Sequence, residues 1–288
     1  MKKEIKERFP NWCNDTENYD LILSDDIDSL MCYSFQKKRY KREVKYFFDV
    51  SYKKITNYNP LGIQKLYGIE GHKQENQERI LGLDLALEYG IKTWDNHIVK
   101  ISDTDKVNSN SANMNIAKNI YQGNYNTKYI VSSFITMLSY YEVDISRWTK
   151  DQLSVLCSID GLYTPFDPCK TFAKRGRDNL RDLGYEFLAD FIIDNTTYIQ
   201  ALEKRLNIKK GKIKVNNLGT LETDIDLVAL SKIFKMPIEL PVGKFISKQE
   251  FRSKTVELNR INEKKALENE KALFNFALIY KNKCVISA

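Results

Sequence analysis

The chain has 288 residues, of which 42% are hydrophobic, 12% aromatic and 29% charged. This composition excludes an intrinsically disordered chain, and the length predicts one large domain with a smaller one beside it. The formal net charge of +7 favours an anionic partner such as a nucleotide or a nucleic acid. A solvated lysine-rich surface explains the same charge, so charge alone assigns no function.

Two further classes of protein are disfavoured. The N-terminal sequence MKKEIKERFPNWC lacks the apolar core of a signal peptide, and no apolar stretch approaches the roughly 20 residues that span a bilayer. We therefore expect a cytoplasmic protein with no membrane contact. The five cysteines are widely spaced without a CxxC pair, which predicts reduced and mostly buried thiols rather than disulfides or a zinc site.

The first elements predict the beginning of a parallel sheet. DLILS, which ends at Ser24, is typical of a short buried strand, residues 30–40 of a helix, and VKYFFDV (44–50) of a second strand. A strand, a helix and a strand in this order form the unit from which parallel sheets are built. Residues 51–77 are expected to connect this unit to the next, with His72 at the protein surface.

The following segments repeat the first pattern. RILGLDLAL (79–87) and IKTWDNHIV (91–99) each place an apolar run before an acidic residue. A loop rich in asparagine and serine follows, then a helix through 129–143 and another from Thr149, its predicted N-cap, to Asp160.

The last third predicts a change of organisation. Residues 177–206 are typical of a long amphipathic helix, 247–273 of a highly charged helix, and FALIYKNKCVIS of a strand. Between the two helices, NIKKGKIKV is enriched in lysine and glycine, which suits a domain boundary. The predicted fold class is α/β, with a parallel-sheet domain in residues 1–175, a helical linker in 176–210 and a smaller α/β domain in 211–288.

Acidic residues follow the predicted strands. Because ligands of a parallel sheet collect outside the carboxyl ends of its strands, acidic residues that end different strands can converge. Carboxylates brought together raise one another's pKa unless a cation lies between them, and hard oxygen ligands suit magnesium or manganese. The residues in question are Asp26, Asp28, Asp84, Asp95 and Asp160, with His97 nearby.

The order of these motifs resembles the DHH phosphoesterase superfamily. SDDIDSL, LGLDLAL, DNH and SIDGLY stand in the order of that superfamily's four motifs, over residues 19–163. Its members include RecJ-type single-strand exonucleases, phosphodiesterases of nano-RNA and cyclic dinucleotides, and family II pyrophosphatases. The resemblance implies a DHH-type catalytic domain followed by a small domain that binds substrate.

The resemblance also implies residue roles. Asp84 would bridge two manganese (or magnesium) ions, with Asp26 on one ion and Asp28 and Asp160 on the other. His97 would face the scissile phosphate, and Asp95 would orient its neighbours.

The sequence departs from the family at two ligands. Ser24 stands where the first motif usually has a metal-binding histidine. Asn96 stands where the DHH motif has the first of its two consecutive histidines. Serine and asparagine replace an imidazole poorly, although Asp25 could partly substitute and Asn96 could ligate through its carbonyl oxygen. One or two ions, and magnesium as well as manganese, therefore stay open. The glycine-rich signature of the family's small domain is absent, so the substrate class is not carried over.

Simpler explanations exist for each acidic residue. Asp26 and Asp28 could cap a helix, and Asp160 could cap the turn at Gly161. Asp84 could lie on the exposed face of an amphipathic helix, which would leave Asp49 as the rival for the second motif.

Two basic segments are candidates for contact with nucleic acid. KKRYKR (37–42) is at a helix end and could equally be a solvated face. KTFAKRGRDNLR (170–181) follows the fourth motif directly, and we expect its Lys174, Arg175 and Arg177 to bind the anionic substrate.

The leading hypothesis is a metal-dependent phosphoesterase that hydrolyses phosphodiester bonds in a nucleotide or a short single-stranded oligonucleotide. The alternative is a catalytically degenerate DHH-fold module that binds nucleic acid or a nucleotide without cleaving it. The missing imidazoles favour the alternative, and the retained acidic positions favour the enzyme. A pyrophosphatase is a third reading, and the oligomeric state stays open.

Overall fold

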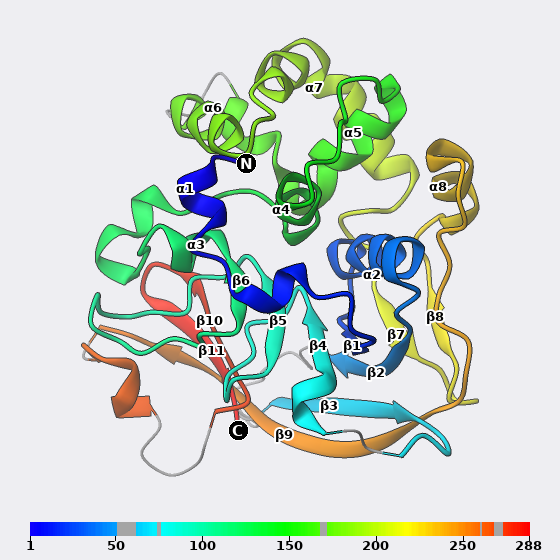
Figure 1. Cartoon of the computed structure of the whole chain (residues 1–288), viewed down its shortest axis with the longest axis vertical. Coiled ribbons are helices and arrows are strands. Elements are labelled where there is room, and N and C mark those ends of the chain that lie inside the picture. Colours follow the sequence, from blue (N-terminus) through cyan, green and yellow to red (C-terminus); the bar gives the residue numbers. More distant parts are fainter. Residues whose placement is uncertain (51–61, 74–75, 168–171, 260, 268–272) are drawn as a thin grey trace.

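The computed structural model of the chain describes residues 1–50, 62–73, 76–167, 172–259, 261–267 and 273–288. Within these residues, nine strands form one mixed, strongly curled sheet in the order β10-β11-β9-β3-β2-β1-β4-β5-β6. Figure 1 shows the sheet in the lower half of the molecule and most helices above it. The helices are α1 (Lys3–Lys6), α2 (Ile27–Tyr40), α3 (Met114–Ala117), α4 (Ser133–Tyr140), α5 (Lys150–Ser158), α6 (Ala173–Asp182), α7 (Phe187–Arg205) and α8 (Leu227–Phe234).

The centre of the sheet is parallel. The central strand, β1 (Asp20–Leu23), lies between β2 (Val44–Asp49) and β4 (Ile80–Leu83). The sheet continues with β5 (Lys92–Asp95) and β6 (Ser111–Asn113), both parallel to their neighbours. Three consecutive residues of β1 are buried, as expected for a parallel strand that is covered on both faces. The predicted strand, helix and strand at the start of the chain are confirmed, with α2 as the connection.

The other side of the sheet is antiparallel and contains the largest errors of the sequence prediction. The strand β3 (Gly62–Ile69) falls in the segment expected to be a connection, and β9 (Phe245–Glu257) falls in the segment expected to be a charged helix. In β9 the charged residues from Glu250 to Lys254 alternate with buried Phe251 and Ser253, which is the period of a strand. FALIYKNKCVIS forms the hairpin of β10 (Asn275–Tyr280) and β11 (Lys283–Ser287).

The prediction of one continuous helix over residues 177–206 is wrong. The segment is divided into α6 and α7, and between them Gly184 adopts a left-handed φ of 77° that ends a helix at little cost. Thr149 caps α5 as predicted, because its hydroxyl accepts the backbone N–H of Gln152. The loop predicted at 107–115 contains β6 and the start of α3.

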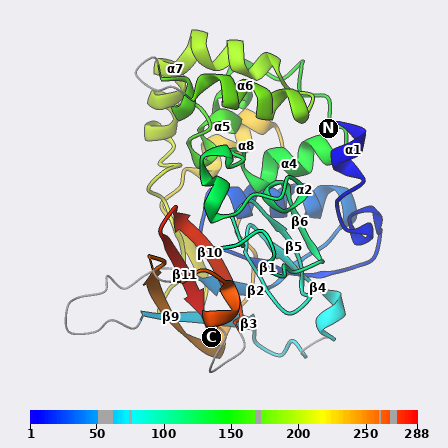
Figure 2. The same ribbon diagram turned by 90° about the vertical axis from the view of Figure 1, so that its left-hand side faces the viewer.

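Residues from the predicted C-terminal domain are part of the same sheet. The strands β9, β10 and β11 are joined to β2 through β3, and the described residues show no second domain. The hairpin of β7 (Ile213–Val215) and β8 (Leu221–Thr223) reaches the end of β1, where Ile213 N–H donates to the Asp25 carbonyl at 2.8 Å. The division at residues 175 and 210 stays a prediction. Figure 2 shows the strands β9, β10 and β11 at the lower left, beneath the helices.

Aromatic rings and free thiols fill part of the interior, and the thiols agree with the expectation from sequence. Trp94 is fully buried among Phe9, Trp12 and Tyr140, at ring-centroid distances of 5.6–6.1 Å. The cysteines that the structure describes are free and buried, while Cys169 lies outside the described residues. In the same part of the chain, no helix has the length and apolar character needed to cross a bilayer.

Gly82 keeps β4 close to its neighbours, and alanine there is expected to destabilise the fold by about 1–3 kcal/mol. An added Cβ would lie 2.6 Å from Leu87 Cδ1 and 2.7 Å from Thr93 Oγ1, and both of these residues are buried. Chemical denaturation measures the change in free energy of unfolding. Gly68→Ala is the matched control, since its Cβ would meet only the flexible chain of Lys248. Equal stability of the two variants would contradict the prediction.

Candidate functional site

Neighbouring parallel strands end in acidic residues at one edge of the sheet. The strand β1 is followed by the turn that holds Asp25, Asp26 and Asp28, and its neighbour β4 is followed by Asp84. The next strand, β5, ends at Asp95. The carboxyl ends of parallel strands therefore collect these side chains at one place, where α/β proteins usually bind their ligands.

The turn after β1 is held rigidly by a serine. Ser24 N–H donates to Ser29 Oγ at 2.8 Å, and the Ser29 hydroxyl donates to the Leu83 carbonyl at 2.9 Å. This fixes the turn to the end of β4. Asp26 is the N-cap of α2, because its Oδ1 accepts the Ser29 N–H at 3.3 Å. The capping role considered for Asp26 is therefore confirmed. The second oxygen of Asp26, Oδ2, is 3.6 Å from Lys212 Nζ.

Asp28 is fully buried and faces the N-terminus of α4. Its two oxygens accept the backbone N–H groups of Ser133 and Phe134 at 2.7 and 2.8 Å. The Ser133 hydroxyl also donates to Asp84 Oδ1 at 2.8 Å. The sequence reasoning did not identify Ser133, and the available signal was its place at a predicted helix start.

Asp84 directly follows a strand and is not part of a helix. Its backbone has a left-handed φ of 56°, and its N–H donates to the Trp94 carbonyl at 2.8 Å. The alternative of an exposed helix position for Asp84 is therefore wrong. The rival Asp49 ends β2, and its charge acts on Asp25.

His97 is oriented by Asp95 and Asn113. Asp95 Oδ1 lies 2.7 Å from His97 Nδ1, and Asp95 Oδ2 accepts the Asn113 amide at 2.6 Å. Burial alone would lower the pKa of His97, but the charge and hydrogen bond of Asp95 raise it to about 9. With Nδ1–H bonded to Asp95, Nε2 is the nitrogen left for a ligand.

Asp160 comes from a different part of the chain, after α5. It has a left-handed φ of 53°, and its Oδ2 accepts the Asn96 amide at 2.5 Å. Asn96 is held in turn by its backbone carbonyl, which accepts the Asn115 side-chain amide at 2.7 Å. This contact makes Asn96 a donor to Asp160.

The carboxylates at this site repel one another. Burial is the first cause that raises the pKa values of Asp28 and Asp84, and the charges of their acidic neighbours raise them further. Asp160 is an exposed residue, but loss of hydration around its carboxyl group, followed by the charge of Asp26, raises its pKa as well. Burial and Asp26 raise the pKa of Asp25 to about 7, although Lys212 opposes the shift. The cluster of Asp25, Asp26, Asp28, Asp84 and Asp160, called the acidic cluster below, therefore has more negative charge than its surroundings compensate.

Two lysines approach the acidic cluster, and the sequence reasoning missed both. Lys212 Nζ is 3.1 Å from Asp25 Oδ1, and the charges of Asp26 and Asp25 raise its pKa although burial lowers it. Burial lowers the pKa of Lys128 more than the attraction of Asp160, Asp95 and Asp84 raises it. Lys212 belongs to the lysine-rich segment that was interpreted as a domain boundary. Lys128 directly follows a 3-10 helix, Gln122–Thr127, and no sequence pattern marked it.

The acidic cluster opens into two cavities. One of about 460 Å³ is lined by Ser24, Asp84, His97 and Lys212, among others, and by β10 and β11 residues on its far side. The second, of about 340 Å³, is lined by Asp160, Lys209 and Lys212. Asp26 and Lys212 line both, so a ligand could approach the cluster from two directions.

Comparison of the chain with family models, curated proteins and solved structures gave no match. The resemblance to the DHH superfamily therefore rests on the order of the motifs.

The residues fit a hard cation by donor type and by charge. Carboxylate oxygens predominate, and the Ser24 hydroxyl is buried without a hydrogen-bond partner in the described structure. Among the described residues, however, no three His, Cys, Asp or Glu side chains are placed to hold a metal ion as they stand. A bound ion would therefore have to draw the carboxylates inward.

Several predicted residues lie elsewhere. Lys174, Arg175 and Arg177 are on α6, where Arg177 pairs with Asp190 at 2.5 Å and Arg175 stacks on Phe172 at 4.6 Å. They do not line either cavity at the acidic cluster, and their role in substrate binding stays a prediction. The surface position expected for His72 is wrong, because the half-buried ring lies 2.8 Å from Asp20 Oδ2.

Proposed function

We propose that the chain is a metal-dependent phosphoesterase that hydrolyses phosphodiester bonds in a nucleotide or a short single-stranded oligonucleotide. The observation that carries the proposal is the acidic cluster, in which carboxylates from three chain segments, the buried Asp28 and Asp84 among them, repel one another beside an oriented histidine. Such an arrangement costs stability in the absence of a cation, so it suits a site that is completed by one.

Asp26, Asp28, Asp84 and Asp160 would supply carboxylate ligands to one or two magnesium or manganese ions, and Asn96 could add an amide oxygen. A bound ion would supply a nucleophilic water and stabilise charge on the phosphate oxygens. Ser133 positions two of the ligands, because its N–H holds Asp28 and its hydroxyl holds Asp84. These contacts set the positions from which a bound ion would draw the two carboxylates inward.

His97 would donate from Nε2 to an oxygen of the scissile phosphodiester. Asp95 fixes the ring from the opposite side, and Asn113 holds Asp95. Water attacks phosphorus, the bond to the leaving oxygen breaks, and the products are a phosphomonoester and an alcohol. Lys212 and Lys128 supply positive charge near the acidic cluster, where it would attract an anionic substrate.

Replacement of His97 by asparagine is expected to lower the rate of hydrolysis about 100- to 10,000-fold, the usual loss for a positioned proton donor. The assay follows nitrophenolate release from bis(p-nitrophenyl) phosphate, and product length from an end-labelled oligonucleotide, with Mn²⁺ or Mg²⁺ present. Asp103→Asn, an exposed acid outside the acidic cluster, is the control and should keep wild-type activity. Turnover of free pyrophosphate without diester hydrolysis would favour a pyrophosphatase instead.

A second candidate is a non-catalytic module of the same kind that binds nucleic acid or a nucleotide. The ion pairs of Lys212 with Asp25 and Asp26 favour it, because an ammonium group already neutralises one side of the acidic cluster. Binding of a labelled oligonucleotide without turnover at any Mn²⁺ or Mg²⁺ concentration would decide for this candidate.

A further inference from the structure

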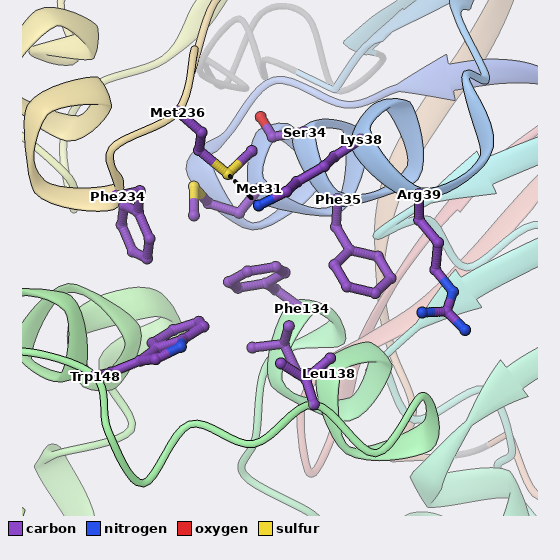
Figure 3. Close-up of a pocket in the computed structure, with 11 residues that line it drawn as sticks. Met31, Ser34, Phe35, Lys38, Arg39, Phe134, Leu138, Trp148, Phe234 and Met236 are labelled. Carbon is purple, nitrogen blue, oxygen red and sulfur yellow. Dashed lines mark hydrogen bonds between the residues drawn. The ribbon is translucent and has the colours of Figure 1, made fainter.

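A separate cavity of about 400 Å³ lies along the C-terminal half of α2. Its wall is formed by α2, by α4, by the segment before α5 and by the end of α8, as Figure 3 shows. Its volume falls in the range of roughly 300–1,000 Å³ that is usual for ligand sites. No carboxylate lines it, in contrast to the cavities at the acidic cluster.

Aromatic rings from separate elements face this cavity. Phe35 is on α2, Phe134 on α4, Trp148 precedes α5, and Phe234 ends α8. The rings of Trp148 and Phe234 meet edge to face, with centroids 5.6 Å apart and an interplanar angle of 82°. Phe134 is almost fully buried, whereas the other three rings are half-buried. Flat apolar groups are the ligands that such a slot accepts best.

Two cations stand at the rim of the cavity. Lys38 Nζ has a weak contact with Met236 Sδ at 4.0 Å, and the Arg39 guanidinium stacks on Tyr141 at 4.8 Å. Neither forms an ion pair with a carboxylate in the described part of the chain. The neighbouring Lys37 differs, because it pairs with Glu43 and Glu239 at 3.6 and 3.4 Å. Lys38 and Arg39 therefore keep their charge for an external anion.

An aromatic slot beside exposed cations matches single-stranded nucleic acid, whose bases stack on aromatic rings while its phosphates bind basic side chains. We propose that this cavity binds one unstacked base of a single-stranded nucleic acid, with Lys38 and Arg39 on the adjoining phosphates. The site requires no metal and no cleavage, and it gives the KKRYKR segment a function.

One residue, Phe134, contacts both the cavity and the acidic cluster. Phe134 donates its N–H to Asp28 and turns its ring into the cavity. Along α2, Asp28 and Lys38 are ten residues apart, which corresponds to about 15 Å of helix. A strand bound at the cavity would thus be held near the acidic cluster.

Trp148 provides a direct test by fluorescence. Trp12 and Trp94 are buried in the main core, whereas Trp148 lines the cavity and is half-buried. Titration with a short oligothymidylate, in EDTA to prevent metal-dependent hydrolysis, is expected to quench its emission. The apparent affinity should fall steeply with salt, because phosphate contacts release counterions.

Variants separate the contribution of the cavity to binding from the contribution of positive charge. The double variant Lys38→Glu and Arg39→Glu should weaken binding by about tenfold or more, while Lys254→Glu on the distant strand β9 should leave it unchanged. Val143→Phe, which fills the cavity from a loop without adding a second fluorescent indole, should abolish quenching even if the charges are kept. Circular dichroism confirms that each variant folds.

The outcomes are distinct from those of the proposed function. Quenching without hydrolysis in Mn²⁺ supports this site and refutes the phosphoesterase. Hydrolysis without quenching, or quenching that Val143→Phe leaves intact, overturns this site alone. Quenching by an amphipathic helical peptide but not by oligothymidylate would also overturn it, in favour of a protein partner.

Discussion

Replacement of Asp84 by asparagine is expected to abolish phosphodiester hydrolysis and, at the same time, to stabilise the metal-free protein above neutral pH. The charges of Asp26 and Asp160 act on Asp84, and the charge of Asp84 acts on Asp28. If it bridges the bound ions, its loss should remove several kcal/mol of transition-state stabilisation, which is a decrease of about 1,000-fold or more in rate.

The gain in stability follows from the pKa of Asp84. Burial first, and then the charges of Asp26 and Asp160, raise this pKa in the folded state. The unfolded chain loses the same proton near pH 4. The free energy of unfolding therefore decreases as the pH rises from about 4 through the folded pKa, because ionisation is more costly in the folded state. Asparagine carries no charge and avoids this decrease.

Denaturant titrations in EDTA at two pH values measure this effect. At about pH 8 the Asp84→Asn variant should be more stable than the wild type by about 1–3 kcal/mol, with the difference largely lost at about pH 4. The amide oxygen of asparagine can still accept the Ser133 hydroxyl, so that contact is kept. Asp103→Asn should change neither quantity. Full hydrolysis by the variant would refute the proposed function, and lower stability at both pH values would show that the charge of Asp84 is already compensated.

The acidic positions were predictable from sequence because their signal is local. A short apolar run that ends in an acid requires only a few neighbouring residues to be recognised, and the sheet order then places β1, β4 and β5 side by side. The same holds for the Thr149 cap, where the hydroxyl and its partner are three residues apart. Local rules of this kind gave the parallel centre of the sheet.

The residues that compensate charge could not be predicted in this way. Lys212 reaches Asp25 across 187 residues, and Ser133 reaches Asp28 across 105, so no spacing in the sequence marks either contact. The strand β9 was hidden for another reason. Its outward residues are charged, which resembles a solvated helix until the antiparallel partners β3 and β11 are known. Tertiary pairing, rather than local preference, selects the strand.

Replacement of Lys212 by methionine is expected to raise the affinity of the acidic cluster for Mn²⁺ by about tenfold or more. The ammonium group lies 3.1 Å from Asp25 and 3.6 Å from Asp26, so it competes with a metal ion for the same oxygens. A competing unit charge near a protein surface is worth about 1–4 kcal/mol at such distances. Calorimetric titration gives both the affinity and the number of ions bound.

The same substitution should destabilise the metal-free protein. Asp25 is almost fully buried, and loss of its cation raises the cost of its ionisation, so the effect should be larger at about pH 8 than at about pH 5. Mn²⁺ should then restore stability, which would appear as a larger increase in Tm than the ion gives to the wild type. Lys209→Met is the matched control, since Lys209 lines the smaller cavity without an ion pair to a described carboxylate.

The number of ions decides what Lys212 does in the wild type. One ion bound by the wild type and two by Lys212→Met would mean that the ammonium group holds the place of an ion. Ser24 would bind such an ion poorly, because it stands where the superfamily that the motif order resembles has a histidine. An unchanged Mn²⁺ affinity in the variant would instead show that Asp25 and Asp26 contribute no ligands. The metal site would then be confined to Asp28, Asp84 and Asp160, and Asp26 would be left with its capping of α2.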